Sequence, residues 1–473
     1  MSTSLTTSPG ERGAGEQSSR SFRRTLGLLL GSLVVMCLVL VGINILNGPR
    51  LTGFEIDTTA AVSQTNARLV LSANQQLLNV APEQITLSPA HPFSLQTSAD
   101  SIVISFTNPL AYDTDYTVTV RDVTGSSTNR SSTFEVDFRT QEPPLFYLLR
   151  DDVGPDRILR TRIGSPTADV AFEAPRITEF TTFGERLVVV TLDDTGASVL
   201  SLIDEEGVLS NVNVPGIGQI EDLGGVPAEN LVGFRFTSAA DAPGPLFENV
   251  LFMLDLGLGI TDPILGLDGE PVQAVQWSFM AGRADLVAQL YDGTILLLNP
   301  RTNADASAEP IPLGQYSGLT TVAPDGLRIA VADQGSQFVL DLSTGTEDQI
   351  MPAEVLGTTP YTDELRFLAG GGFVQRMAQF DPVTGQPKQR LTLVQGEERR
   401  VVYEPASAGE TIVGFTLSPN DQYAAVQIIP NRDDQMADDY PVNGQVTAAT
   451  TLFVDLATGE IRRSVVGFDA TWR

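Results

Sequence analysis

The sequence predicts an all-β protein whose one long apolar segment lies near the N-terminus, and three observations support this class. Short runs of β-branched and aromatic residues, separated by Gly, Pro, Asn and Asp, follow one another from residue 51 to the end. A unit of 43 to 54 residues repeats through the last two-thirds of the chain. The long apolar run, residues 25–46, precedes all of these strands.

The composition bounds the functions that the chain can have. The chain has 473 residues, of which 42% are hydrophobic and 18% are charged, which suits several packed domains rather than disorder. One Cys and one His exclude a disulfide scaffold and a Cys-ligated metal cluster. The net charge of -29 repels phosphate backbones, so we expect no nucleic-acid partner.

The apolar segment Thr25–Leu46 has the properties of a transmembrane helix. It contains 22 residues without a charge, enough to cross about 30 Å of hydrocarbon. Arg20, Arg23 and Arg24 precede it, and positive charge on that side predicts a cytoplasmic N-terminus. We therefore expect residues 1–24 to be a disordered cytoplasmic tail. The bulk of the chain would then lie outside the cytoplasm, on a single-pass anchor.

A cleaved signal peptide is the alternative reading of the same segment. Its apolar core would measure about 7–15 residues and would end in a small-residue cleavage site. The core here is longer, and residues 44–49 (Asn-Ile-Leu-Asn-Gly-Pro) suit cleavage poorly. Lipoprotein processing at Cys37 would need a small residue before it, where Met36 stands. The uncleaved anchor remains the prediction.

The segment after the anchor, residues 51–142, is predicted to be a small β-sandwich. Its length and strand spacing suit an immunoglobulin-like domain. In Tyr116–Val120 the β-branched and aromatic residues stand at every second position, as a half-buried antiparallel strand requires. The other expected strands are residues 67–71, 102–106 and 134–138.

The second half of this segment resembles a known family. The run from Leu110 to Val120, followed by residues 122–125 and 138–140, is similar to the bacterial Ig-like domains of the SbsA type. The resemblance implies a spacer or surface module. Residues 141–144 (Gln-Glu-Pro-Pro) are the predicted linker to the rest of the chain, and the two prolines favour an extended conformation.

Residues 145–473 are predicted to form a β-propeller, because the pattern beyond residue 145 repeats. Residues 323–331 and 418–426 share a small residue, a Pro, a turn pair and an apolar strand. An Asp-x-x-Thr-Gly turn closes strands at 341–345, 381–385 and 455–459. One residue marks the first strand of each unit: Phe180, Leu223, Trp277, Thr321, Phe367, Phe415 and Phe468.

The ends of the repeat predict how the ring closes. Residues 145–175 contain three strands, and residues 465–472 look like one strand that then stops. Pairing the two would complete one sheet and remove two open edges, so Ala470 should lie near Tyr147. This gives seven blades, with six or eight as alternatives because residues 239–248 are inserted. The Pro-Asp-Gly and Asp-x-x-Thr-Gly pieces resemble the WD40-like repeats of TolB-type propellers.

The residues argue against most kinds of catalysis. A Ser-His-Asp or Cys-His arrangement needs an imidazole, and the only His, His91, lies in a turn outside the repeat. Cys37 lies in the anchor. We therefore expect no enzyme. A pair of carboxylates in the channel of the propeller is the one catalytic alternative left open.

The densest acidic cluster is the one candidate metal site. Asp433, Asp434, Asp438 and Asp439 follow one another between two strands of the last unit. Carboxylate oxygens are ligands for calcium, although the EF-hand spacing is absent. The competing reading is a solvated acidic loop. Apart from calcium, we expect no cofactor. Trp277 and Trp472 stand on matching strands, where packing between blades competes with sugar stacking.

Together these features predict a membrane-anchored extracytoplasmic binding or scaffold protein, whose propeller face recognises an envelope protein or glycan. The alternative is a carboxylate-dependent hydrolase of cell-envelope polysaccharide. A calcium-stabilised adhesion module is the third hypothesis. Arg outnumbers Lys 28 to 1, which together with the bacterial-type Ig segment favours a bacterial plasma membrane.

Overall fold

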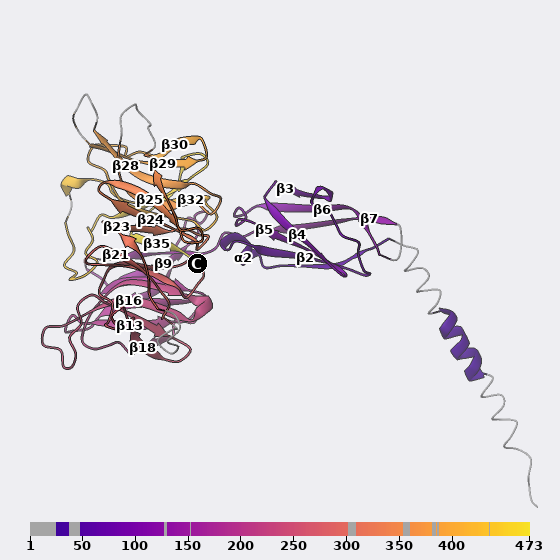
Figure 1. The fold of residues 1–473 in the computed structure, drawn as a ribbon, viewed down its shortest axis with the longest axis horizontal. Coiled ribbons are helices and arrows are strands. Elements are labelled where there is room, and N and C mark those ends of the chain that lie inside the picture. Colours follow the sequence, from indigo (N-terminus) through magenta and orange to yellow (C-terminus); the bar gives the residue numbers. More distant parts are fainter. Residues whose placement is uncertain are drawn as a thin grey trace, which may run out of the picture. The chain divides into compact units, whose positions relative to one another are not determined.

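A computed structural model describes residues 25–36, 48–126, 130–151, 153–300, 309–352, 360–380, 385, 387–434 and 436–473. The fold is nearly all β, as predicted. It divides into two compact units (Figure 1). The first spans Met1–Asp57, Arg68–Ser105 and Asp115–Phe138, and the second spans Thr58–Ala67, Phe106–Thr114 and Arg139–Arg473.

The N-terminal segment is helical over residues 25–36. Among the described residues, no helix is long and apolar enough to cross a membrane. Residues 1–24 and 37–46 of the predicted tail and anchor lie outside the described residues, so the anchor stays a prediction.

The first unit contains two antiparallel sheets. One has the order β1–β2–β5–β4 and the other the order β3–β6–β7. Burial alternates along β5 and β7, so every second side chain of each strand is directed into a core. The strands are β1 (Leu51–Ile56), β2 (Ala67–Ala73), β3 (Ile85–Ser88), β4 (Phe93–Ser98), β5 (Ser101–Phe106), β6 (Asp115–Thr124) and β7 (Ser131–Arg139), with the short helix η1 (Pro82–Gln84) between β2 and β3. The helix α2 (Thr58–Ser63), which follows β1 in the sequence, belongs to the second unit.

The second unit contains seven four-stranded antiparallel sheets among the described residues; six are meanders of consecutive strands, and the seventh combines three consecutive strands with β35. In chain order they are β8 (Leu145–Leu149), β9 (Asp156–Thr161) and β10 (Asp169–Ala174) with β35 (Phe468–Trp472); β11 (Ile177–Phe183), β12 (Arg186–Leu192), β13 (Ser198–Ile203) and β14 (Leu209–Asn211); β15 (Gly218–Val226), β16 (Leu231–Ser238), β17 (Val250–Asp255) and β18 (Ile260–Pro263); β19 (Ala274–Phe279), β20 (Leu286–Leu290), β21 (Thr294–Leu298) and β22 (Ile311–Gln315); β23 (Gly318–Val322), β24 (Arg328–Asp333), β25 (Ser336–Asp341) and β26 (Thr346–Ile350); β27 (Tyr361–Phe367), β28 (Phe373–Phe380), β29 (Pro387–Gln395) and β30 (Glu398–Tyr403); β31 (Thr411–Leu417), β32 (Tyr423–Ile429), β33 (Thr450–Asp455) and β34 (Ile461–Val466).

The sheets form a closed β-propeller. Each of the strands β11, β15, β19, β23, β27 and β31 contacts the next, and β35 contacts β11 on one side and β32 and β33 on the other. These first strands therefore surround a common axis. The seven residues that the sequence marked, from Phe180 to Phe468, all lie on them. Two short helices, η2 (Pro227–Glu229) and η4 (Arg432–Asp434), lie in loops.

The ring closes at the sheet that contains both ends of the repeat. The last strand, β35, pairs antiparallel with β8, with Phe468 opposite Leu148 and Trp472 opposite Leu145. This is the latch that the three-plus-one strand count predicted. The pairing satisfies the inner edge of β8, which would otherwise be an open strand edge.

The core of the propeller lies between neighbouring sheets. Val188 and Val190 of β12, for example, pack against Val232 and Phe234 of β16 in one buried cluster. Both faces of the middle strands are buried, and this explains why they read as continuous apolar runs such as Leu187–Val190. The first strands of these packed sheets carry the residues of the candidate site.

Candidate functional site

The strands nearest the axis share one local irregularity. Each of the seven first strands has a shift in register, near its start in most of them and in the middle of β15, so one or two residues of each strand lack a partner on the second strand. Asp222 and Asp469 lie in such bulges with φ of 54° and 52°. Aspartate tolerates this left-handed conformation better than most residues. Because a bulge interrupts the alternation of side chains along a strand, it places side chains near the axis that a regular strand would direct elsewhere.

A cavity of about 440 Å³ lies along the axis. Residues of the five consecutive first strands from β11 to β27 line it. Glu179, Asp222, Trp277, Thr320 and Arg366 contribute side chains of very different chemistry to the wall. The indole of Trp277 fills the space left by Gly224 and Gly233 in the neighbouring sheet, where an added Cβ would overlap the ring.

Glu179 is the most perturbed acid of this cavity. One carboxylate oxygen accepts a hydrogen bond from the backbone N–H of Leu223 (2.8 Å), and the other accepts one from Nδ2 of Asn443 (3.2 Å). Burial and, to a smaller extent, the negative charges of Asp222 and Asp469 together raise the pKa of Glu179 to about 8, although its hydrogen bonds oppose the rise. Glu179 is therefore largely protonated at neutral pH.

Asp469, Glu179 and Asp222 belong to three consecutive first strands, β35, β11 and β15. The protein that surrounds Asp469 desolvates its carboxylate and raises its pKa, although the residue is accessible to solvent, and the charge of Arg150 opposes this rise. Arg235 compensates Asp222, because its Nε donates to the carboxylate at 2.5 Å. One side of the axis is thus rich in carboxylates from adjacent sheets.

Arginines on second strands join neighbouring sheets around the axis. Arg235 of β16 contacts Asp222 on the first strand of its own sheet and donates to the carbonyl of Ala274 on the next (3.4 Å). Arg376 of β28 repeats this arrangement, since it donates to Asp363 on its own sheet (2.8 Å) and to the carbonyl of Ile412 on the next (3.3 Å). Each arginine satisfies polar groups on two sheets at once.

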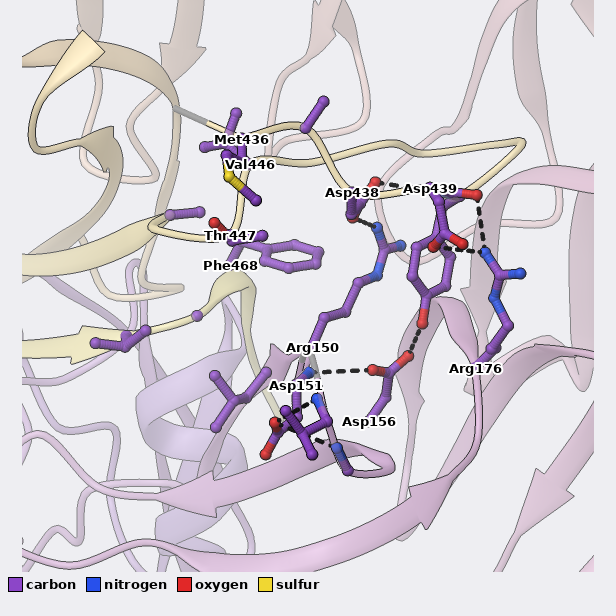
Figure 2. Close-up of a pocket in the computed structure, with 18 of the residues that line it drawn as sticks. Arg150, Asp151, Asp156, Arg176, Met436, Asp438, Asp439, Val446, Thr447 and Phe468 are labelled. Carbon is purple, nitrogen blue, oxygen red and sulfur yellow. Dashed lines mark hydrogen bonds and ion pairs between the residues drawn. The ribbon is translucent and has the colours of Figure 1, made fainter. Parts of the chain in front are cut away.

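The third arginine of this kind, Arg150, follows β8 and holds the long loop between β32 and β33 (Figure 2). Its guanidinium forms an ion pair with Asp438 and donates to the carbonyl of Asn443 (2.9 Å). The same group donates to the carbonyl of Thr178 on the next sheet (3.0 Å). It also stacks over the ring of Tyr440, 3.7 Å from the centroid.

Two more contacts attach this loop, residues 430–449, to the second unit's first sheets. Arg176 pairs with Asp439 (3.2 Å), and the hydroxyl of Tyr440 donates to Asp156 (Figure 2). Asp156 in turn accepts a hydrogen bond from the backbone N–H of Ile177 (2.7 Å). The loop, which we call the strap, therefore connects the last sheet to the closing sheet and to the sheet after it. A cavity of about 570 Å³ lies beneath it.

The structure does not bring Asp433, Asp438 and Asp439, the predicted calcium ligands whose side chains it describes, to one point. Asp438 and Asp439 pair with different arginines, and Asp433 is exposed in η4. The side chain of Asp434 lies outside the described part of the chain. Among the described residues, no group of three or more His, Cys, Asp or Glu side chains could hold a metal ion. Calcium binding stays a prediction without a ligand cluster to support it.

Sequence reasoning missed the arginines that hold this region together. Arg150, Arg176, Arg235 and Arg376 stand alone in ordinary strands or links, and nothing near them in the sequence suggests a partner. Their one signal is position, because Arg235 and Arg376 lie on second strands and Arg150 directly follows one. The packing role expected for Trp277 and Trp472 agrees with the structure, where Trp472 packs edge-on against Phe453.

Known proteins resemble the chain in fold alone. No protein-family model and no curated protein matches it. Similar solved structures include the β-propeller domain of the trilobed protease from Pyrococcus furiosus, at 11% identity, covering 75% of this chain and 97% of that one with a TM-score of 0.41. Another is the β-propeller domain of Cps50 (Swd1) from Myceliophteria thermophila, at 10% identity, covering 62% of this chain and 87% of that one with a TM-score of 0.39.

Proposed function

We propose that the chain is a binding or scaffold protein, anchored in a bacterial plasma membrane through Thr25–Leu46. Its Ig-like domain and seven-bladed propeller would lie outside the cytoplasm and recognise an envelope protein or glycan. The observation that carries the proposal is that the polar side chains around the axis form hydrogen bonds and ion pairs with one another and with neighbouring sheets. Groups engaged in this way stabilise the ring and are not available to act on a substrate.

The contacts of the axial acids support a binding role over catalysis. Both oxygens of Glu179 already accept hydrogen bonds, and Asp222 and Asp363 each pair with an arginine. A general acid or nucleophile must reach the reacting atoms of its substrate. A rigid ring with loops at both ends instead offers fixed surfaces for recognition.

Cross-linking from the propeller surface tests the binding role. The full chain would carry a photoreactive residue at Leu267 or Leu327, on opposite ends of the sheets, and would be irradiated in intact cells. We expect a defined adduct with one envelope component from one end. Absence of any adduct from several exposed positions at both ends would contradict a binding role.

The membrane location has its own support and its own test. The 22 uncharged residues and the preceding arginines carry the proposal of a single-pass anchor with a cytoplasmic N-terminus. Protease added outside intact spheroplasts should then digest the propeller. Full protection of the propeller, with digestion only after lysis, would refute this orientation.

A carboxylate-dependent hydrolase remains the second candidate, because Glu179 and Asp222 line one axial cavity and the raised pKa leaves Glu179 protonated at neutral pH. A protonated acid beside a second carboxylate is the arrangement of glycoside hydrolysis. Release of reducing sugar ends from cell-envelope polysaccharide by the purified full chain, lost in Glu179→Gln and retained in Glu205→Gln, would favour this candidate over the binding role.

A further inference from the structure

Three loops of two neighbouring sheets lie together at one end of the propeller. They are residues 239–249 between β16 and β17, 264–273 between β18 and β19, and 291–293 between β20 and β21. Asn249 Nδ2 donates to the hydroxyl of Tyr291 (2.6 Å), and Gln273 Nε2 donates to the carbonyl of Glu248 (3.2 Å). The loops therefore form one connected surface, which we call the platform.

The platform has a fixed shape. Its middle loop is a small hairpin, with a β-bridge between Leu265 and Pro271 and a hydrogen bond from Gly266 N–H to the carbonyl of Glu270 (2.8 Å). Ile264 and Val272, at the base of the hairpin, are buried in the core between the two sheets. A surface held in this way loses little conformational entropy when a partner binds.

Large apolar side chains gather on the platform and its border. They are between 38% and 64% exposed, although soluble proteins usually bury such groups or keep them apart. Leu267 lies near the tip of the hairpin, and Val275 lies in the bulge at the start of β19, directly after the hairpin loop. The members of this patch are Leu246, Leu265, Leu267, Val275 and Tyr291.

The charge around the patch has one sign. The three loops contain five acidic residues and no basic residue. All five are exposed, and none forms an ion pair within the described part of the chain. Arg235 lies close by, but its guanidinium is engaged by Glu221, Asp222 and Asn249. The acids are Asp241, Glu248, Asp268, Glu270 and Asp292.

We propose that the platform docks a basic, apolar segment of a partner polypeptide, in which Lys or Arg side chains alternate with large apolar ones. The apolar residues would cover the patch, and the basic residues would face the five unpaired carboxylates. A second copy of this chain or an anionic lipid surface would place like charges together. The inference rests on the proposed binding role and names the chemistry of its partner.

Binding of a defined peptide to the immobilised full chain tests the proposal. The probe is a short peptide of alternating Lys and Leu, with Lys/Ser and Glu/Leu peptides as controls for its apolar and basic parts. We expect the Lys/Leu peptide to bind most tightly. The double variants Leu246→Ser/Leu267→Ser and Asp268→Asn/Glu270→Gln should each weaken it about tenfold.

Matched variants at the other end of the sheets separate the platform from general charge attraction. Leu258→Ser/Leu327→Ser and Glu205→Gln/Glu206→Gln make the same chemical changes at exposed residues there, and they should leave the affinity unchanged. No binding of the Lys/Leu peptide, or equal binding by all variants, would overturn the proposal. If an envelope partner cross-links elsewhere and the platform variants have no effect, only this inference fails. If no envelope partner exists but the peptide binds the platform, only the proposed function fails.

Discussion

Replacing Arg150 by Met should cost the propeller much more stability than the same change at Arg176. Both arginines pair with adjacent acids of the strap, Asp438 and Asp439. The Arg150 side chain is 8% exposed and its partner 11%, whereas Arg176 is 35% exposed and its partner 90%. The two variants therefore compare a buried Arg–Asp ion pair with an exposed one.

The magnitude follows from what each change leaves behind. Removing Arg150 leaves the Asp438 carboxylate buried without a counterion and takes a donor from three backbone carbonyls. Losing one partner of a buried ion pair costs about 3–5 kcal/mol. An exposed pair such as Arg176–Asp439 contributes about 0–1 kcal/mol. In Arg150→Met/Asp438→Leu the buried charge is gone as well, so part of the lost stability should return.

Urea unfolding followed by tryptophan fluorescence measures these differences. The chain has two tryptophans, Trp277 and Trp472, and both lie in the second unit, so the signal reports on the propeller. We expect a clearly lower midpoint for Arg150→Met and a nearly unchanged one for Arg176→Met. Equal losses in the two variants, or a loss below about 1 kcal/mol at Arg150, would refute the argument from burial.

Two further predictions use the same assay, and a third uses circular dichroism and gel filtration. Burial raises the folded-state pKa of Glu179 above its ordinary value, so the native state holds a proton that the unfolded state releases. The free energy of unfolding should therefore fall as the pH rises from about 4.5 towards 8, and Glu179→Gln should flatten that fall. An unchanged pH profile in the variant would contradict the raised pKa of Glu179. Gly233→Ala should cost about 1–3 kcal/mol because the new Cβ overlaps the Trp277 indole, while Gly216→Ala, which meets no atom within 4 Å, should not; equal midpoints would be evidence against this packing. Deleting residues 467–473 removes β35 and opens the ring, so circular dichroism and gel filtration should show lost structure or aggregation, and a native-like propeller after this deletion would disprove the latch.

The strands and the latch could be predicted from the sequence because their signals are local. Leu145–Leu149 reads as a strand by its own composition, and the unmatched strand at residues 468–472 needs a partner. The same local reading failed to find the role of the acidic loop. Four nearby carboxylates suggested a metal, but Arg150 lies 288 residues from Asp438, and no pattern in the sequence connects them.

The axial acids show a second limit of sequence reasoning. Asp222 and Asp469 face the axis because a bulge interrupts the alternation of their strands, and a period of two places neither of them there. Burial is the main cause of the raised pKa of Glu179, and the charges of those two acids, which belong to different sheets, add to it. Such properties arise only once the ring has closed.

The closing sheet also fixes when this protein can fold. Its strands β8, β9 and β10 are the first of the propeller to be synthesised, and its fourth strand, β35, is synthesised after all the other strands of the propeller. The ring is incomplete until β35 has been synthesised, and β8 keeps one edge unpaired for some 300 residues of further synthesis. A nascent chain that stalls before Phe468 leaves the ribosome with that edge open to any other strand it meets.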